Sequence, residues 1–189
     1  MSNNRFEVLG GLPPYGPAPL PFPENGDGAY REGLVVRFHQ ATGATWIGNF
    51  QRSILGCDWV IDHPDRRQVI VIAGGTGYFV DPELRRQTHG LGGGVSFAQH
   101  VPDLNIVLIG DALSFAAFSA DGLWWNSDRI SWGGMRNTVA GNVALRGEAW
   151  SPVSGNWHPF ELDLLTGKSN GAIFEKEIKT AIQISPQGP

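Results

Sequence analysis

Three apolar runs recur along the chain at a fixed spacing: VIVIAGG (69–75), IVLIGDA (106–112) and VALRGEA (143–149). Their first residues are 37 positions apart in both intervals. Each run has the composition of a short strand and reaches a glycine beside a turn or an acid. Repetition at this period predicts β-meander units that follow one another along the chain.

Shorter strands surround these runs. LVVRF (34–38) and TWIGNF (45–50) read as a hairpin, and residues 34–57 form a degraded fourth unit. We predict an all-β fold of repeated antiparallel β-meander units, closed as a barrel or a sandwich, with a small propeller-like fold as the alternative. Helical periodicity is absent except over 175–182, which fits either a short helix or a last strand.

Composition divides the chain into three parts. Residues 1–30 are rich in Pro and Gly, which disfavours a helix or a central strand, so we predict an N-terminal arm packed on the core. Residues 31–174 are predicted to form a single β-domain of about four meander units, and 175–189 a C-terminal tail. The apolar side chains of the arm that we expect to lie over the core are Tyr15, Leu20 and Phe22.

Charge and cysteine content restrict the partners and the compartment. The net charge is −4 and no run of Lys or Arg exists, which disfavours nucleic-acid binding. One cysteine, Cys57, excludes an internal disulfide and favours a reducing cytoplasm. No signal peptide is evident at the N-terminus, and the apolar stretches fall short of the roughly 18–20 residues that cross a bilayer. We therefore predict a cytoplasmic protein without membrane contact.

Several segments together resemble an uncharacterised family of bacterial proteins. They are LPPYGPAPLPF (12–22), GATWIGNFQRS (43–53), DHPDRRQVIVIAGGTGYFVDP (62–82), RISWGGMRN (129–137) and GEAWSPVSGNWHPFELDLLTG (147–167). The resemblance implies a bacterial, cytoplasmic and β-rich protein, and the family has no established activity. It also implies an acidic residue in relatives at the position of Gly133.

The candidate site is the aromatic and polar segment WWNSDRISWGGMRN (124–137). Because alternate residues of a strand face opposite sides, we expect one tryptophan of the pair in the core and the other outside. Exposed Trp beside Arg and Asp can hold a sugar ring or a partner loop. In the alternative interpretation, the tryptophans fill a sheet core and Asp128 forms a surface ion pair with Arg129. The predicted binding residues are Trp124, Trp125, Asp128, Arg129, Trp132, Arg136 and Trp157.

Acids and histidines offer a weaker case for chemistry. His63 and His100 precede Pro-Asp turns and match by repeat position, as do Asp111 and Glu148 after the glycines. Turn formation explains these residues, with a metal or an acid–base pair as the alternative. The glycine run GLGGG (90–94) lacks the context of a phosphate loop and predicts a flexible or bulged turn. We predict no catalytic residue, no metal site and no cofactor.

These observations favour a binding or accessory protein that acts through a protein partner. Its concrete form is immunity-type neutralisation of a toxin. The first alternative is a β-domain that binds carbohydrate or another small ligand through the Trp cluster. The second is an enzyme that uses Asp111, Glu148 and His63. A homodimer is a further expectation, since open sheet edges need caps or partners.

Overall fold

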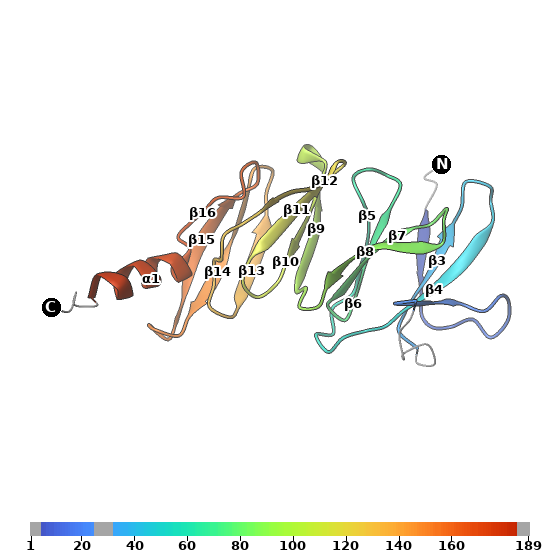
Figure 1. The fold of residues 1–189 in the computed structure, drawn as a ribbon, viewed down its shortest axis with the longest axis horizontal. Coiled ribbons are helices and arrows are strands. Elements are labelled where there is room, and N and C mark those ends of the chain that lie inside the picture. Colours follow the sequence, from blue (N-terminus) through green and yellow to red (C-terminus); the bar gives the residue numbers. More distant parts are fainter. Residues whose placement is uncertain (1–4, 25–31, 185–189) are drawn as a thin grey trace. The chain divides into compact units, whose positions relative to one another are not determined.

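The structure is a computed structural model of the chain that describes residues 5–24 and 32–184 (Figure 1). The strands up to Ser96 are β1 (Phe6–Leu9), β2 (Leu20–Phe22), β3 (Leu34–His39), β4 (Thr45–Phe50), β5 (Trp59–Asp62), β6 (Val69–Ala73), β7 (Thr76–Asp81) and β8 (Arg86–Gly92). The later elements are β9 (Phe97–Val101), the 3-10 turn η1 (Pro102–Leu104), β10 (Ile106–Gly110), β11 (Phe115–Ser119), β12 (Gly122–Asn126), β13 (Met135–Ala140), β14 (Ala144–Ser151), β15 (Asn156–Asp163), β16 (Ser169–Asn170) and α1 (Ile173–Ile184).

The chain divides into two compact units, Met1–Ser96 (unit 1) and Phe97–Pro189 (unit 2). Unit 1 holds a first sheet in the order β1-β3-β4-β2 and a second in the order β5-β6-β7-β8. Unit 2 holds a third sheet, β9 to β12, and a fourth, β13 to β16, each in sequence order. The all-β prediction with repeated antiparallel meanders is therefore confirmed, and none of the four sheets, as described, closes into a barrel.

The three apolar runs occupy equivalent places in this architecture. They supply β6, β10 and β14, and each of these is the second strand of its own sheet. All residues of β6 and β10 are buried, as their apolar composition requires. The 37-residue spacing thus marks one sheet per repeat. The weaker unit predicted at 34–57 supplies β3 and β4 of the first sheet.

The first sheet is built differently from the others, because both of its edge strands, β1 and β2, come from the N-terminal arm. Strand β2 pairs in parallel with β4, with Phe22 opposite Phe50. Phe22 is 2% exposed, and its ring stacks on that of Phe50 at 4.7 Å. Pro21 is tolerated because β2 lies at the sheet edge. Of the three apolar side chains expected to lie over the core, Phe22 does so, whereas Leu20 is 38% and Tyr15 90% exposed.

Each unit has its own hydrophobic core between its two sheets. In unit 1 the aromatic side chains of the first sheet meet the aliphatic side chains of β6, the second strand of the second sheet. The buried members are Phe22, Leu34, Val36, Phe38, Trp46, Phe50, Val69, Val71, Ala73, Tyr78 and Val80. In unit 2 residues of β9 to β12 meet those of β14, β15 and the start of α1. Burial of this apolar surface is the main term that stabilises either unit.

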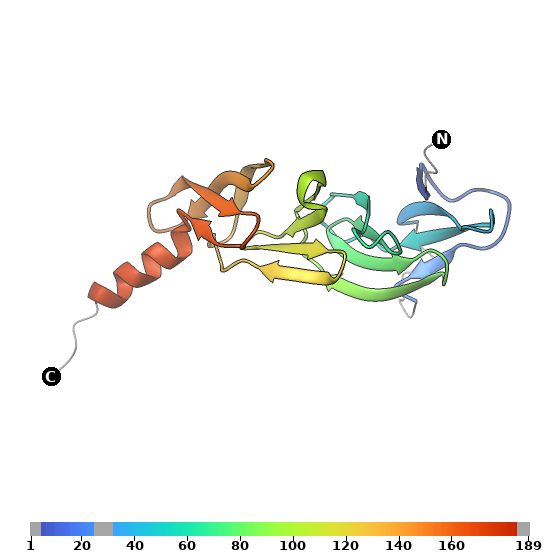
Figure 2. The same cartoon turned by 90° about the horizontal axis from the view of Figure 1, so that it is seen from above.

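Helix α1 resolves the ambiguity over 175–182 in favour of a helix. Its first residues are fixed to unit 2, since Ile173 is buried and the Phe174 N–H donates to the Ile130 carbonyl at 3.3 Å. Figures 1 and 2 show the helix leaving the fourth sheet beyond this point. Among the described residues, no helix is long and apolar enough to cross a membrane. The boundaries predicted for a single β-domain stay a prediction.

Candidate functional site

The predicted tryptophan pair lies on β12, the edge strand of the third sheet. Trp125 is buried, and its indole N–H donates to the Leu164 carbonyl at 3.0 Å. Trp124 is 45% exposed and sits at a β-bulge, because Ala117 pairs with Trp125 while Phe118 pairs with Leu123. The expectation of one core tryptophan and one outward tryptophan is confirmed.

Arg129 is held by the backbone of unit 2. Its Nε donates to the Ser131 carbonyl at 2.9 Å and its NH2 group to the Trp132 carbonyl at 2.7 Å. Its guanidinium carbon lies 4.3 Å from the centre of the Phe174 ring, which is a cation–π contact. Asp128 is exposed, and within the described part of the chain it forms no ion pair with Arg129. The alternative of a surface ion pair between the two is therefore wrong.

Trp132 joins the start of α1 to the fourth sheet. Its ring meets the Phe174 ring edge-on at 4.7 Å, and its Nε1 donates to Glu177 Oε2 at 2.5 Å. The second oxygen of Glu177 accepts a hydrogen bond from the Ser151 hydroxyl at the end of β14. Arg129, Trp132 and Phe174 form what we term the helix anchor, together with Glu177. Two of the seven predicted binding residues therefore serve an internal contact.

Arg136 and Trp157 form a second cluster, on β13 and β15. The Arg136 guanidinium lies 4.4 Å from the centre of the Trp157 ring, and the Trp150 ring lies 5.4 Å away on its strand neighbour β14. Arg136 Nε also donates to Glu148 Oε2 at 2.9 Å. This hydrogen bond, with another from the Asn137 amide, lowers the pKa of Glu148. The chain's own arginine thus lies over one face of the Trp157 ring.

The repeat-matched histidines differ in register. Asp62 pairs with Val69 and Val101 pairs with Ile106, so the structural counterpart of His63 is Pro102 and not His100. The mismatch arises because the turn before β6 spans residues 63–68, whereas the turn before β10 spans 102–105. The expected equivalence of His63 and His100 is therefore wrong.

The repeat-matched acids differ as well. Asp111 lies in a turn, where its Oδ1 accepts hydrogen bonds from the N–H groups of Leu113 and Ser114 at 2.7 and 2.8 Å. Glu148 lies inside β14, because that strand continues to Ser151 before it turns. Among the described residues, no group of three or more His, Cys, Asp or Glu could hold a metal ion.

His63 belongs to a turn that is tightly bonded within itself. The buried imidazole accepts the Asp65 N–H at 3.2 Å and meets the Phe79 ring edge-on. Burial raises the pKa of Asp65, but hydrogen bonds from the Gln68 backbone and side chain and from the Arg67 backbone, with His63 nearby, outweigh it. The pKa falls from 3.8 to about 2. These groups stabilise the turn and are already occupied by one another.

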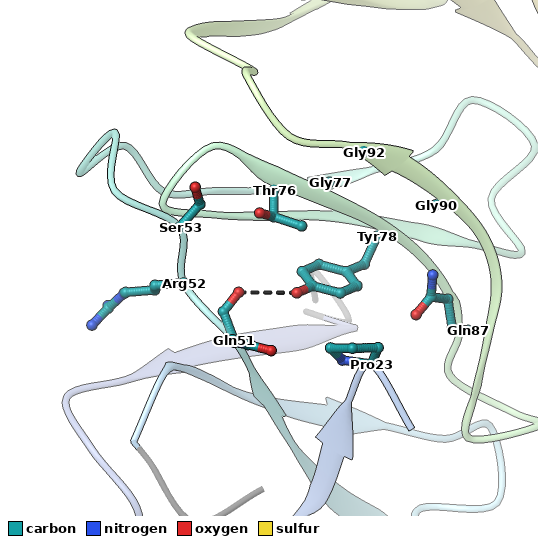
Figure 3. Close-up of a pocket in the computed structure, with 10 residues that line it drawn as sticks. All are labelled: Pro23, Gln51, Arg52, Ser53, Thr76, Gly77, Tyr78, Gln87, Gly90 and Gly92. Carbon is teal, nitrogen blue, oxygen red and sulfur yellow. Dashed lines mark hydrogen bonds between the residues drawn. The ribbon is translucent and has the colours of Figure 1, made fainter. Parts of the chain in front are cut away.

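Sequence reasoning missed a hollow in unit 1 with a volume of about 480 Å³. Polar side chains and glycines from the loop after β4, from β7 and from β8 line it, together with Pro23 (Figure 3). The lining residues are Pro23, Gln51, Arg52, Ser53, Thr76, Gly77, Tyr78, Gln87, Gly90 and Gly92. The one signal in the sequence was the density of glycine at 74–77 and 90–94. The second run includes the end of β8, where one register shift lies between Gly90 and Gly92, in line with the prediction of a flexible or bulged turn.

Cys57 is bonded within the same unit. Its Sγ donates to the Val95 carbonyl at 3.1 Å, and burial raises the pKa of its thiol. Both effects keep the protonated form, which is the less nucleophilic one. The Cys57 thiol is thus held by a contact within unit 1.

Comparison with known proteins gives little. No protein-family model matches the chain, and no curated protein matches it. Among solved structures, the chain is similar to one titled "Crystal structure of the eukaryotic initiation factor", with 12% sequence identity and a TM-score of 0.42. The alignment covers 75% of this chain and 39% of that one, so the chain spans well under half of that protein's length. The resemblance to a bacterial family stays a prediction.

Proposed function

We propose that the protein is a binding module that docks a protein partner through the loop 51–58 of unit 1. The observation that carries the proposal is the exposure of two adjacent aliphatic side chains in this loop. Ile54 is 96% exposed and Leu55 is 49% exposed. When a partner covers a large aliphatic side chain that was almost entirely in water, the burial of its apolar surface stabilises the complex.

The loop is fixed in place, although its tip is exposed. The N–H groups of Ser53 and Leu55 donate to the carbonyls of Ala73 and Gly74, each at 3.2 Å, in the β6–β7 turn. Gly75 returns a hydrogen bond to the Cys57 carbonyl at 3.1 Å. A loop already ordered in the free protein loses little conformational entropy on binding. The fixed loop therefore favours a partner whose surface is complementary to the loop in shape.

A salt bridge closes the base of the loop. Arg52 donates to Asp58 Oδ2 from Nε at 3.1 Å and from NH2 at 2.8 Å. The other oxygen of Asp58 accepts the Gly74 N–H at 2.8 Å. Residues 52 and 58 are thereby held together, so Ile54 is presented at the tip of a short, fixed loop. A partner that fits this loop is a protein with an apolar pocket for one branched side chain. In the immunity-type form of this proposal, that partner is a toxin.

The test compares two exposed apolar residues, one in the loop and one in unit 2. The partner is captured by cross-linking in the cells that encode the protein, identified, purified, and titrated against the Ile54→Asp and Val153→Asp variants. Val153, 74% exposed in the turn after β14 of unit 2, is the matched control. We expect Ile54→Asp to weaken binding by about 30-fold or more, which is the effect of a central contact residue, and Val153→Asp to leave it unchanged.

Two results would overturn the proposal. The first is equal affinity of the purified partner for wild type and Ile54→Asp. The second is a homodimer, measured by light scattering, that Ile54→Asp converts to a monomer, since the loop would then bind a second copy of this chain.

A further inference from the structure

The hollow of unit 1 has a chemical composition that the loop proposal does not use. Its volume of about 480 Å³ lies in the range of small-molecule sites. Figure 3 shows Tyr78 in the middle, reaching toward Gln51, with Gln87 on one side and Ser53 and Arg52 on the other. The side chains come from strands and from the fixed loop, so the site is formed in the free protein.

Uncharged hydrogen-bonding groups dominate the lining. Ser53, Thr76 and Tyr78 supply hydroxyls, and Gln51 and Gln87 supply carboxamides. None of the ten lining residues that the structure describes carries a carboxylate. Hydroxyl and carboxamide groups both donate and accept, which is what a ligand with many hydroxyls requires.

The charge of the one lining arginine is already balanced. Arg52 binds Asp58 through two nitrogens, and Asp58 lies outside the lining. A phosphate or carboxylate ligand would have to compete with this salt bridge for the guanidinium. The hollow therefore offers hydrogen bonds without a net charge, which favours a neutral ligand over an anionic one.

Tyr78 contributes its polar end to the hollow, because the residue is 3% exposed and its ring packs against Phe50 in the core of unit 1. Its hydroxyl donates to the Gln51 carbonyl at 2.9 Å, which leaves the oxygen able to accept from a ligand. Burial raises the pKa of Tyr78, so the hydroxyl stays protonated at neutral pH. The exposed Pro23 ring is an apolar surface of the lining. A pyranose presents one C–H face and a rim of hydroxyls, and this combination suits it.

Two glycines of the lining, Gly77 and Gly90, differ in the space beside them. A Cβ at Gly77 would lie 2.7 Å from the Leu91 side chain, so this position admits no larger residue without a shift. A Cβ at Gly90 would meet the end of the Gln87 side chain at 3.2 Å and nothing else nearby. Gly90 is therefore the place where a side chain can fill the hollow without backbone strain.

We propose that this hollow binds a neutral sugar, with Gln51, Tyr78 and Gln87 as the central contact residues. The site is separate from the side chains of Ile54 and Leu55, which the hollow does not include. It also places sugar binding on unit 1 and not on the tryptophan cluster of unit 2.

The experiment titrates the full chain with methyl glycosides of glucose, galactose and N-acetylglucosamine, using amide resonances in two-dimensional NMR. We expect saturable shifts at the Gly77, Gly90 and Gly92 amides with at least one glycoside. Gly90→Val should abolish them, and Gln87→Ala should weaken binding by up to about tenfold, the effect of one hydrogen bond. Gln99→Ala, a strand glutamine of β9 in unit 2, should change nothing.

The controls separate this proposal from its competitors and from the protein partner. Inorganic phosphate should leave the glycine amides in place, and saturable shifts with phosphate alone would overturn the assignment of a neutral ligand. Equal glycoside binding by wild type and Gly90→Val, or no glycoside-dependent shift at millimolar concentration, would also overturn it. Ile54→Asp should bind the glycoside normally, so failure of either proposal leaves the other measurable.

Discussion

Unit 1 and unit 2 each pack two four-stranded sheets around a core of their own, yet they attach their terminal segments by different contacts. Unit 1 inserts Phe22 of the N-terminal arm into its core, where the ring stacks on Phe50. Unit 2 fastens α1 at its surface through Trp132, Arg129 and Glu177. The residues that most resemble a binding site in the sequence thus largely make contacts within the chain. The open hollow is lined instead by common polar residues and glycines.

Removal of the Phe22 ring tests the attachment in unit 1 and should have the largest effect. Phe22→Ala should destabilise unit 1 by about 3–4 kcal/mol, because it leaves a cavity beside Phe50 and Trp46. Leu20→Ala, on the same strand at 38% exposure, should cost about 1 kcal/mol or less. Urea unfolding followed by hydrogen exchange at β4 amides measures both. Similar losses for the two variants would show that β2 is not held by its aromatic contact.

The two tryptophans that the sequence treats alike should behave differently. Trp132→Ala should destabilise unit 2 by about 2–3 kcal/mol, because Phe174 and Glu177 both lose their partner. Trp124→Ala, at an exposed bulge, should cost well under about 1 kcal/mol. Exchange of the Phe174 and Lys176 amides reports the docking of α1. If Trp132→Ala leaves these amides protected, the helix anchor does not hold the helix.

The Asp65 turn offers the smallest and most specific test. Since folding lowers its pKa from 3.8 to about 2, Asp65 stabilises unit 1 at pH values above 3.8 and loses this contribution as the pH falls toward 2. After a discount for solvent screening, Asp65→Asn should cost about 1 kcal/mol near neutral pH, and the difference from wild type should close between those two values. Thermal unfolding at a series of pH values measures this.

A matched control comes from the other unit. Asp103 is exposed in η1, the turn of unit 2 that corresponds to the Asp65 turn. Asp103→Asn removes the same charge and leaves the Asp65 hydrogen bonds intact, so it should not alter the acid dependence of unit 1. An equal effect of the two variants would assign the acid dependence to net charge.

The repeated strands could be predicted from the sequence because burial imposes a composition. VIVIA and IVLIG are apolar on both faces and end at glycine, so the sequence indicates a buried strand in the interior of each unit. The parallel pairing of β2 with β4 could not be predicted, since nothing in the sequence LPF distinguishes a strand from an extended arm. The 37-residue spacing also did not predict where β14 ends, because that strand is longer than β10.

The candidate sites were harder to predict than the fold. The tryptophan and arginine segment was conspicuous by composition, but composition does not show that Arg129 and Arg136 stack on rings of the same chain. The hollow in unit 1 is lined by glycine, hydroxyl and carboxamide residues from β7, β8 and the loop after β4. Each is unremarkable in its own segment, and pairing across the sheet brings them together.

The pairing of β2 with β4 has a consequence for the order in which the protein forms during synthesis. In the third sheet, β9 to β12 emerge from the ribosome in the order in which they pair, so each new strand finds its neighbour already present. Strand β2 emerges before β4, and Phe22 must wait for Phe50. The first sheet is the earliest begun, yet it cannot be completed strand by strand as the third can.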